Sequence, residues 1–445
     1  MSATTMKAAR YPALRHRNFT LIWAGLIVSN MGTWMQNIAQ SWLIYKLTGN
    51  NPLFLGYLGL SFALPMTFLT PVGGIFVDRV DRVRLLYVTQ SAAALSAAVM
   101  AGLAWTERLT PGWILAASFF QALCLAFDNP ARQSLIPELV PREHLLNALS
   151  LNSATYTGAA LIGPALGGAM LGLVGASWLY LLNAISYLAV IGALAAMRDV
   201  PPSPRRTEPW REALLGGVRF ILRHRLILVM LMMSSLAALF ARSYQQLLPI
   251  FADDIWHTSA SGYGQLLSAA GLGALVGALG LSSVRNLRAQ GRVMVVSGIA
   301  LCLALAFFAL SPWFWLGLLL LIVVGVSATV FTTMISTTIQ LRTPNEVRGR
   351  VMSFYAATLI GLPSLGALAV AAVARELGAE VPGGVARIAL GALRGFGVVA
   401  ATERLGPVAG APRAIVLGAL IIGVVVLLAA PAILRIRAPA GTGGD

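Results

Sequence analysis

The chain has 445 residues, of which 58% are hydrophobic and only 11% are charged, far below the roughly 25% charged residues of a typical soluble domain. In a soluble protein of this size much of that apolar surface would face water, so the composition favours a protein embedded in lipid. The net charge of +16 does not indicate nucleic-acid binding, because the basic residues lie in short clusters between apolar runs and form no basic face.

Residues 1–18 are predicted to be a cytoplasmic tail. Their basic residues precede an apolar run that is much longer than the core of a signal peptide and has no small-residue cleavage site after it. A cleavable signal is therefore not expected.

Twelve apolar segments follow along the chain, each long enough to cross a bilayer as a helix. They cover residues 19–47, 53–77, 85–105, 112–136, 146–172, 176–197, 226–250, 261–284, 292–310, 313–338, 350–374 and 414–434. The expected fold class is an all-α integral membrane protein with twelve transmembrane helices.

The lysines and arginines indicate the orientation. If the N-terminus is inside and the spans alternate, 24 of the 32 basic residues lie in inside segments, seven lie outside and Arg242 lies within a span. Basic residues are enriched on the cytoplasmic side of membrane proteins. The distribution predicts a multi-pass protein of the cytoplasmic (inner) cell membrane with both termini cytoplasmic.

Two six-helix halves are predicted, at residues 19–197 and 226–434, joined by a proline-rich cytoplasmic linker at 198–225 and followed by a cytoplasmic tail at 435–445. The glycine-rich segment 375–413 is expected outside the membrane, as a surface hairpin or an interfacial helix pair. Matching residues recur in the two halves, for example at Gly56 and Gly262. This repeat indicates a pseudo-symmetric transporter with its site between the halves, near the bilayer midplane.

Three motifs resemble those of the major facilitator superfamily. They are the run from Gly74 to Arg82 between the second and third spans, Gly163-Pro164-Ala-Leu-Gly167-Gly168 in the fifth, and the run from Phe127 to Gln133 with Arg348-Gly-Arg350-Val-Met-Ser353. The two segments of the third motif, from Phe127 to Gln133 and from Arg348 to Ser353, are similar to the branch that contains the enterobactin exporter and macrolide-efflux proteins. The resemblance covers nearly the whole chain except 375–413.

The resemblance implies a twelve-helix fold that works by alternating access, with export driven by proton antiport. It also implies a gating role for Asp78, Arg79 and Arg82, although the two arginines also fit a simple topology signal. Gly163 and Pro164 permit a bend and close packing in the fifth span, which serves either gating or packing alone.

Polar side chains inside the spans are candidates for the substrate pathway, because such groups are costly in lipid. Two of the spans, the first and the tenth, carry polar stripes at helical spacing. The stripes consist of Asn30, Thr33, Asn37 and Gln40, and of Thr329, Thr333, Ser336 and Gln340. Each stripe lines the pathway or forms hydrogen bonds between helices, and the sequence leaves both interpretations open.

Asp128 lies inside the fourth span, with Gln121 about two turns before it and Arg132 one turn after it. A carboxylate there is expensive to ionise and Arg132 offsets this cost, so Asp128 could bind a proton in one conformation and release it in another. The alternative is a permanent ion pair between Asp128 and Arg132 at helical spacing.

Arg242 in the seventh span, beside Gln245 and Gln246, has three possible roles. It attracts an anionic substrate, holds a coupling carboxylate ionised, or extends toward the outer interface near Asp253 and Asp254.

The expected function is secondary active transport, with proton-coupled export of a small amphipathic molecule such as a drug or a siderophore-like metabolite. Uptake by the same fold, and a non-transporting membrane partner or sensor, are the alternatives. An enzyme is not expected, because the sequence shows no nucleophile–base set, metal cluster or phosphate loop. Neither a cofactor nor a metal site is expected, since Cys124 and Cys302 lie in apolar stretches and the four histidines lack ligand spacing. The expected partners are a small-molecule substrate, protons and the lipid bilayer, without nucleic acid, and a monomer is compatible with the sequence.

Overall fold

The computed structural model describes residues 11–77, 80–198, 219–282, 290–379 and 384–434. The regular structure of these residues is helical, without strands. The N-terminal half contains six long helices: α1 (Arg17–Leu47), α2 (Pro52–Val77), α3 (Arg82–Trp105), α4 (Pro111–Leu135), α5 (Leu145–Val174) and α6 (Ala176–Ala196).

The C-terminal half begins with an interrupted span. It comprises α8 (Arg225–Leu236), a π-helical turn (Ala237–Ala241), α9 (Tyr244–Ile250) and a second π-helical turn (Phe251–Ile255). The long helices that follow are α10 (Ala260–Ser282), α11 (Gln290–Leu310), α12 (Phe314–Arg342), α13 (Asn345–Gly378) and α16 (Gly410–Leu434).

Local sequence signals set several helix ends. Asp81 caps α3, because its Oδ1 accepts a hydrogen bond of 2.9 Å from the backbone N–H of Arg84. Pro111 is the first residue of α4, a position where its missing N–H would have no partner in the helix. Gly175 has a φ of 83° and forms the turn that separates α5 from α6.

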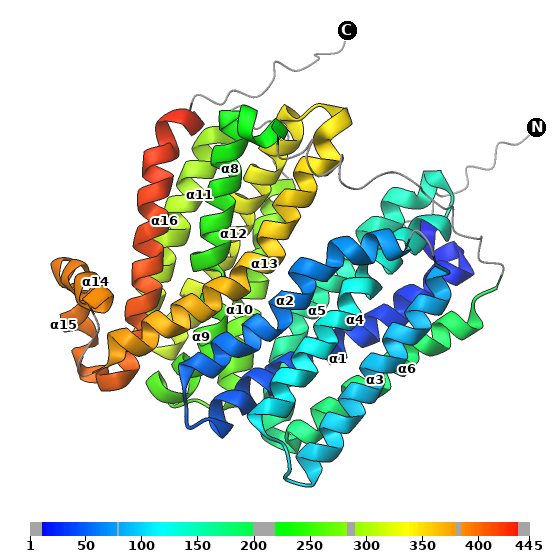
Figure 1. The fold of residues 1–445 in the computed structure, drawn as a ribbon, viewed down its shortest axis with the longest axis horizontal. Helices are drawn as coiled ribbons and strands as arrows, with labels where there is room; N and C mark the ends of the chain where they lie inside the picture. Colours follow the sequence, from blue (N-terminus) through cyan, green and yellow to red (C-terminus); the bar gives the residue numbers. More distant parts are fainter. Residues whose placement is uncertain (1–10, 78–79, 199–218, 283–289, 380–383, 435–445) are drawn as a thin grey trace, which may run out of the picture.

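The two halves lie side by side (Figure 1). Within the N-terminal half, α1 packs on α5 and α6, and α4 packs on α2 and α3. Within the C-terminal half, α12 packs on α10 and α11, and α16 packs on α11 and α13. The halves meet where α2 packs on α13 and α5 packs on α10. If the interrupted span counts as the first of the C-terminal half, each half contributes its second and fifth long segment to the junction, as expected of two pseudo-symmetric halves.

The helix bundle has two ends, which are distinguished by where the first and last helices begin and end. The termini face is the end at which α1 begins and α16 ends, and the distal face is the opposite end, at which α1 ends and α16 begins. In Figure 1 the helices of the two halves meet toward the distal face and diverge toward the termini face, which is uppermost.

By length and composition, ten helices in the described part of the chain are able to cross a membrane. They do not include α1 and α13, which pack within the same bundle, and the predicted twelve spans are reached if these two also cross. Large apolar side chains are exposed on spanning helices, such as Leu95 on α3 (67%) and Leu428 on α16 (77%). Lipid accommodates this surface, and the predicted all-α, multi-pass membrane architecture is confirmed.

The segment expected at 375–413 contains two short helices, α14 (Gly384–Gly395) and α15 (Val398–Thr402), and a 3₁₀ turn (Glu403–Ala409). They lie beside α16 near the distal face, outside the bundle (Figure 1). Arg413 on α16 fixes this segment, since its Nε donates to Thr402 Oγ1 at 3.0 Å and its Nη1 donates to the carbonyl oxygen of Leu377 at 2.8 Å.

Candidate functional site

A cavity of ≈ 200 Å³ lies between the halves and is called here the interface cavity. Its walls come from α1, α2 and α4 on one side and from α9 and α10 on the other. Polar side chains from both halves line it, including Asn37, Gln40, Ser118, Gln245, Gln246 and Tyr263. Gln40 is among the lining residues, and its buried Nε2 atom has no hydrogen-bond partner among the described residues.

The predicted stripe on α1 is therefore divided. Asn37 and Gln40 line the interface cavity, whereas Asn30 and Thr33 are half-buried and lie nearer the start of the helix. Gln245 from the C-terminal half reaches the same cavity.

A buried amide network in the N-terminal half stands beside this stripe. Asn183 on α6 is fully buried, and its Nδ2 donates to Gln36 Oε1 at 2.6 Å. Gln36 Nε2 donates in turn to Gln121 Oε1 at 3.4 Å, and Ser186 Oγ donates to Asn183 Oδ1 at 3.0 Å. The predicted candidate Gln121 thus joins α4 to α1 and α6. Gln36 and Asn183 were not predicted, although each is an amide inside an apolar run, which is a signal for interhelical hydrogen bonding.

A polar cluster joins the halves at the distal face and is called here the distal latch: Tyr45, Lys46 and Asn50 with Asp253 and Asp254. Lys46 pairs with Asp253, and the Tyr45 hydroxyl donates to Asp254. Asn50 Nδ2 donates to Asp253 Oδ2 at 3.0 Å and to Asp254 Oδ1 at 2.6 Å. Beneath the latch, Trp42 and Tyr263 stack across the junction with ring centroids 6.3 Å apart.

Asp128 is 2% exposed and lies within the N-terminal half. Its Oδ1 accepts hydrogen bonds from Gln90 Nε2 at 2.7 Å and Thr89 Oγ1 at 3.1 Å, both on α3. Its Oδ2 lies 2.5 Å from Arg132 Nη2 in an ion-pair contact that lacks the alignment of a hydrogen bond. Arg132 also donates to Asn129 Oδ1 at 3.0 Å. These contacts join α3 to α4 near the termini face, and the carboxylate has a partner for its negative charge.

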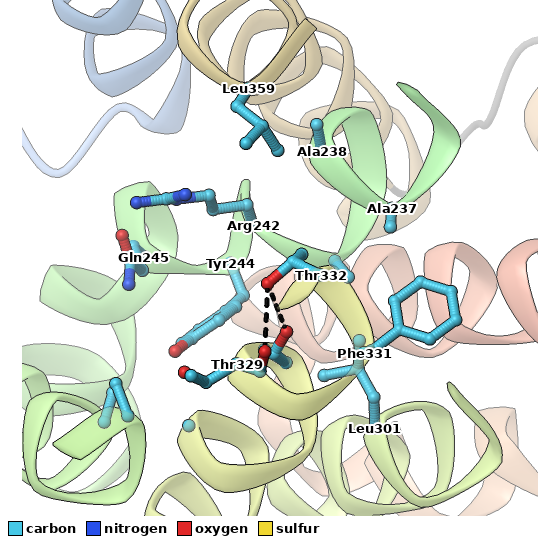
Figure 2. Close-up of a pocket in the computed structure, with 15 residues that line it drawn as sticks. Ala237, Ala238, Arg242, Tyr244, Gln245, Leu301, Thr329, Phe331, Thr332 and Leu359 are labelled. Carbon is cyan, nitrogen blue, oxygen red and sulfur yellow. Dashed lines mark hydrogen bonds between the residues drawn. The ribbon is translucent and has the colours of Figure 1, made fainter. Parts of the chain in front are cut away.

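Arg242 follows the π-helical turn and lines a second cavity, of ≈ 160 Å³, that lies within the C-terminal half. Figure 2 shows Arg242 and Gln245 on the same side of this cavity, with Thr329 and Thr332 of α12 below them. Of the predicted stripe on α12, Thr329 lines this cavity and Thr333 is exposed, while Ser336 accepts a hydrogen bond of 3.0 Å from Gln340.

A profile of the family described as transmembrane secretion effector matches residues 8–405 of the sequence. The chain belongs to this family. Its curated relatives include the enterobactin exporter EntS of Shigella boydii serotype 18, which is 28% identical over 299 residues, covering 66% of this chain and 71% of that protein. The EntS of Citrobacter koseri is 27% identical over 331 residues, covering 74% of this chain and 76% of that protein.

Solved transporters share the fold of this secretion effector family member. The nucleoside transporter NupG superposes with a TM-score of 0.71 at 13% identity, covering 95% of this chain and 100% of that one. A bacterial homologue of the human lysosomal transporter Spinster, in an inward-facing and unoccupied conformation, gives a TM-score of 0.70 at 15% identity, covering 95% of this chain and 99% of that one. The predicted major facilitator resemblance is confirmed, and the family and its relatives are transporters rather than enzymes.

Two of the motifs shared with the superfamily have defined contacts in this structure. Arg82 at the start of α3 is paired with Glu138, and its Nη1 donates to the carbonyl oxygen of Ser134 at 3.2 Å. These contacts remain inside the N-terminal half and join α3 to the end of α4. Asp78 and Arg79 lie outside the described residues.

The glycine motif of α5 lies against both halves. A Cβ at Gly163 would meet the side chain of Trp34 at 2.5 Å, and one at Gly167 would meet Met35 Cα at 2.9 Å. On the other side, a Cβ at Gly168 would meet the carbonyl oxygen of Ala260 at 2.6 Å and Gly264 Cα at 2.9 Å. Pro164 supports the same contact with its carbonyl oxygen, which lies against Gly264. Only glycine permits α5 and α10 to approach at this distance.

Proposed function

We propose that this protein exports a small amphipathic molecule across the cytoplasmic membrane in exchange for protons, by alternating access. The interface cavity supports this most directly, because polar groups from both halves meet there, as in transporters whose halves move around a central site. The enterobactin exporters among its relatives favour export over uptake.

The positive-inside rule supports a cytoplasmic termini face in this proposal. The distal latch then lies on the extracytoplasmic side, and the halves are held together there while they diverge toward the cytoplasm (Figure 1). This arrangement corresponds to an inward-facing state that loads substrate from the cytoplasm. Release on the other side requires the latch to open.

Proton coupling is assigned to Asp128 in this proposal. The carboxylate is buried, and its charge is balanced by Arg132 and two hydrogen bonds from α3. Protonation would weaken the ion pair and leave Arg132 free to change partners, so the packing of α3 on α4 would depend on the proton. Gating is assigned to the motif residues Asp78, Arg79 and Arg82 and to the glycine contact at Gly163 and Pro164.

The test is accumulation of a chemically diverse panel of compounds in cells, with and without a protonophore. We expect the wild type to lower the accumulation of at least one compound, and both the protonophore and Asp128→Asn to abolish this effect. The matched control is Glu107→Gln, which removes an exposed carboxylate of the turn after α3 in the same half and should leave export unchanged. Export that persists in correctly inserted Asp128→Asn would show that coupling does not depend on this carboxylate, and raised accumulation would indicate uptake.

A further inference from the structure

The cavity within the C-terminal half, called here the Arg242 cavity, combines one cation with largely apolar walls. Small side chains of the π-helical turn and of α10 form one wall, and Leu301, Phe331 and Leu359 form the others. Arg242, Gln245 and Thr329 supply polar groups at one side (Figure 2). A site of this composition fits a ligand that is apolar over most of its surface and polar at one end.

Arg242 is a cation in the middle of a spanning segment. It lies thirteen positions before Ile255 at the distal end, about 20 Å of helix at 1.5 Å per residue, which is too far for its side chain to reach the interface. The candidate partners there are also engaged elsewhere, because Asp253 and Asp254 contact Lys46, Tyr45 and Asn50.

Three ion pairs of the described residues are Lys46–Asp253, Arg82–Glu138 and Arg132–Asp128, and none of these three involves Arg242. Its side chain is exposed at the surface of the C-terminal half. A charge at membrane depth without a countercharge is costly, and natural proteins place such charges on substrate or ion pathways. The missing element at this position is an anion.

The α-helix is interrupted at Arg242, and hydrogen bonds stabilise the interruption. The π-helical turn Ala237–Ala241 ends there, and the N–H of Arg242 donates to the carbonyl oxygen of Ala237 at 3.2 Å. Ser243 Oγ donates to the carbonyl oxygens of Leu239 at 2.5 Å and Pro363 at 3.0 Å, so α13 supports the break. Such π-bulges and interrupted spans occur preferentially at ligand sites. Here the break places Arg242 and Gln245 on the same side (Figure 2).

The hydroxyl groups nearby differ in availability. Thr332 Oγ1 already donates to the carbonyl oxygens of Ala328 at 2.8 Å and Thr329 at 3.3 Å, as the dashed lines in Figure 2 show. Arg242 and Gln245 supply the nitrogen donors at this cavity. The planar guanidinium matches a carboxylate through two parallel N–H···O bonds, and the Gln245 amide adds a third donor.

We propose that Arg242 and Gln245 form a subsite for the carboxylate of an amphipathic organic anion, whose apolar body packs on Leu359 and on Ala274 and Ala328 of the cavity wall. This inference rests on the proposed function in that it names the substrate class of the same transporter. Binding to the subsite requires neither a proton gradient nor completed export.

The test compares two probes of nearly equal shape, 2-naphthoate and the neutral 2-naphthamide, by equilibrium dialysis against the purified full-length protein in lipid nanodiscs. We expect the wild type to bind the carboxylate at least about tenfold more tightly than the amide, the usual contribution of a charge-assisted hydrogen-bonded pair. Arg242→Gln should abolish this preference while the affinity for the amide stays the same, which also shows that the variant is folded. Arg242→Lys should retain part of the preference.

Arg394→Gln is the control, because it removes an exposed arginine of α14 and the same unit of charge; it should keep the full preference. Equal affinities of the wild type for both probes, binding of neither probe, or an unchanged preference in Arg242→Gln would each overturn the proposal. If the preference depends on Arg242 but cells show no proton-driven export, the subsite stands and the proposed export function fails.

Discussion

The contact between α5 and α10 provides a test of the proposed alternating access, in which the distal face is closed in one state and open in the other. Gly264→Ala adds a single methyl group at the point where α10 meets Gly168 of α5. The new Cβ would lie 2.9 Å from Gly168 Cα and 3.1 Å from Gly168 N, and closer still to the carbonyl oxygen of Pro164. All three are backbone atoms, so no side chain can rotate to make room, and the helices must separate.

Carbon atoms pack at about 3.5–4.0 Å, so the separation needed is on the order of 1 Å. Overpacking of this kind costs about 1–3 kcal/mol. The cost falls only on the state in which the distal face is closed, whereas the higher helix propensity of alanine, about 1 kcal/mol, applies to both states and cancels. The ratio of closed to open distal faces should fall by about 5- to 150-fold.

The assay is a pulsed electron paramagnetic resonance distance between spin labels at Arg108 and Trp313, which are exposed at the distal ends of opposite halves. The buried Cys124 and Cys302 are first replaced so that only the introduced cysteines react. Gly264→Ala should shift the population toward longer distances. Gly280→Ala is the matched control on the same helix, because a Cβ there meets nothing within 4 Å. Identical distance distributions in Gly264→Ala, Gly280→Ala and the wild type would refute the reasoning.

Two further predictions concern polar contacts. Asp254→Asn removes the charge that accepts hydrogen bonds from Tyr45 and Asn50 in the distal latch, so the same label pair should show a several-fold larger open population. Glu107→Gln, at an exposed carboxylate of the same face, should leave the population unchanged. An unchanged distance distribution in Asp254→Asn would exclude the latch as a gate. Asn183→Leu leaves the buried Gln36 Oε1 without its donor, so the free energy of unfolding in detergent should fall by about 0.6–1.7 kcal/mol. A thermal-unfolding midpoint at or above that of the wild type would contradict this prediction.

The sequence predicted contacts well where the partners lie within one helix. Asp128 and Arg132 are four residues apart, and the structure pairs them. The other partners of Asp128, Thr89 and Gln90, lie on α3 and about forty residues earlier in the chain. No periodicity relates the two stretches, because the rotation of α3 against α4 is set by packing along their whole length.

Only the tertiary structure shows which residues of a predicted polar stripe reach a cavity. Thr329 lines the Arg242 cavity, but its neighbour in the predicted stripe, Thr333, is exposed and the unpredicted Thr332 lines the wall instead. A helical stripe is broad enough to include several residues, and the neighbouring helices decide which of them reach a cavity. Likewise, the π-helical turn before Arg242 follows no sequence rule, because it is stabilised by the bond from Ser243 to Pro363 of α13.

The sequence by itself determined that this chain is a multi-pass helical membrane protein, since apolar length and charge depend only on composition along the chain. Motifs within single segments carried the resemblance to its family. The tertiary structure alone decided that Arg242 lacks a paired carboxylate in the described part of the chain. It also decided that α5 and α10 meet at Gly168 and Gly264. The contacts of the distal latch, from Tyr45, Lys46 and Asn50 to Asp253 and Asp254, likewise appear only in the fold. These contacts join segments roughly one hundred to two hundred residues apart, and only the packing of whole helices brings such segments together.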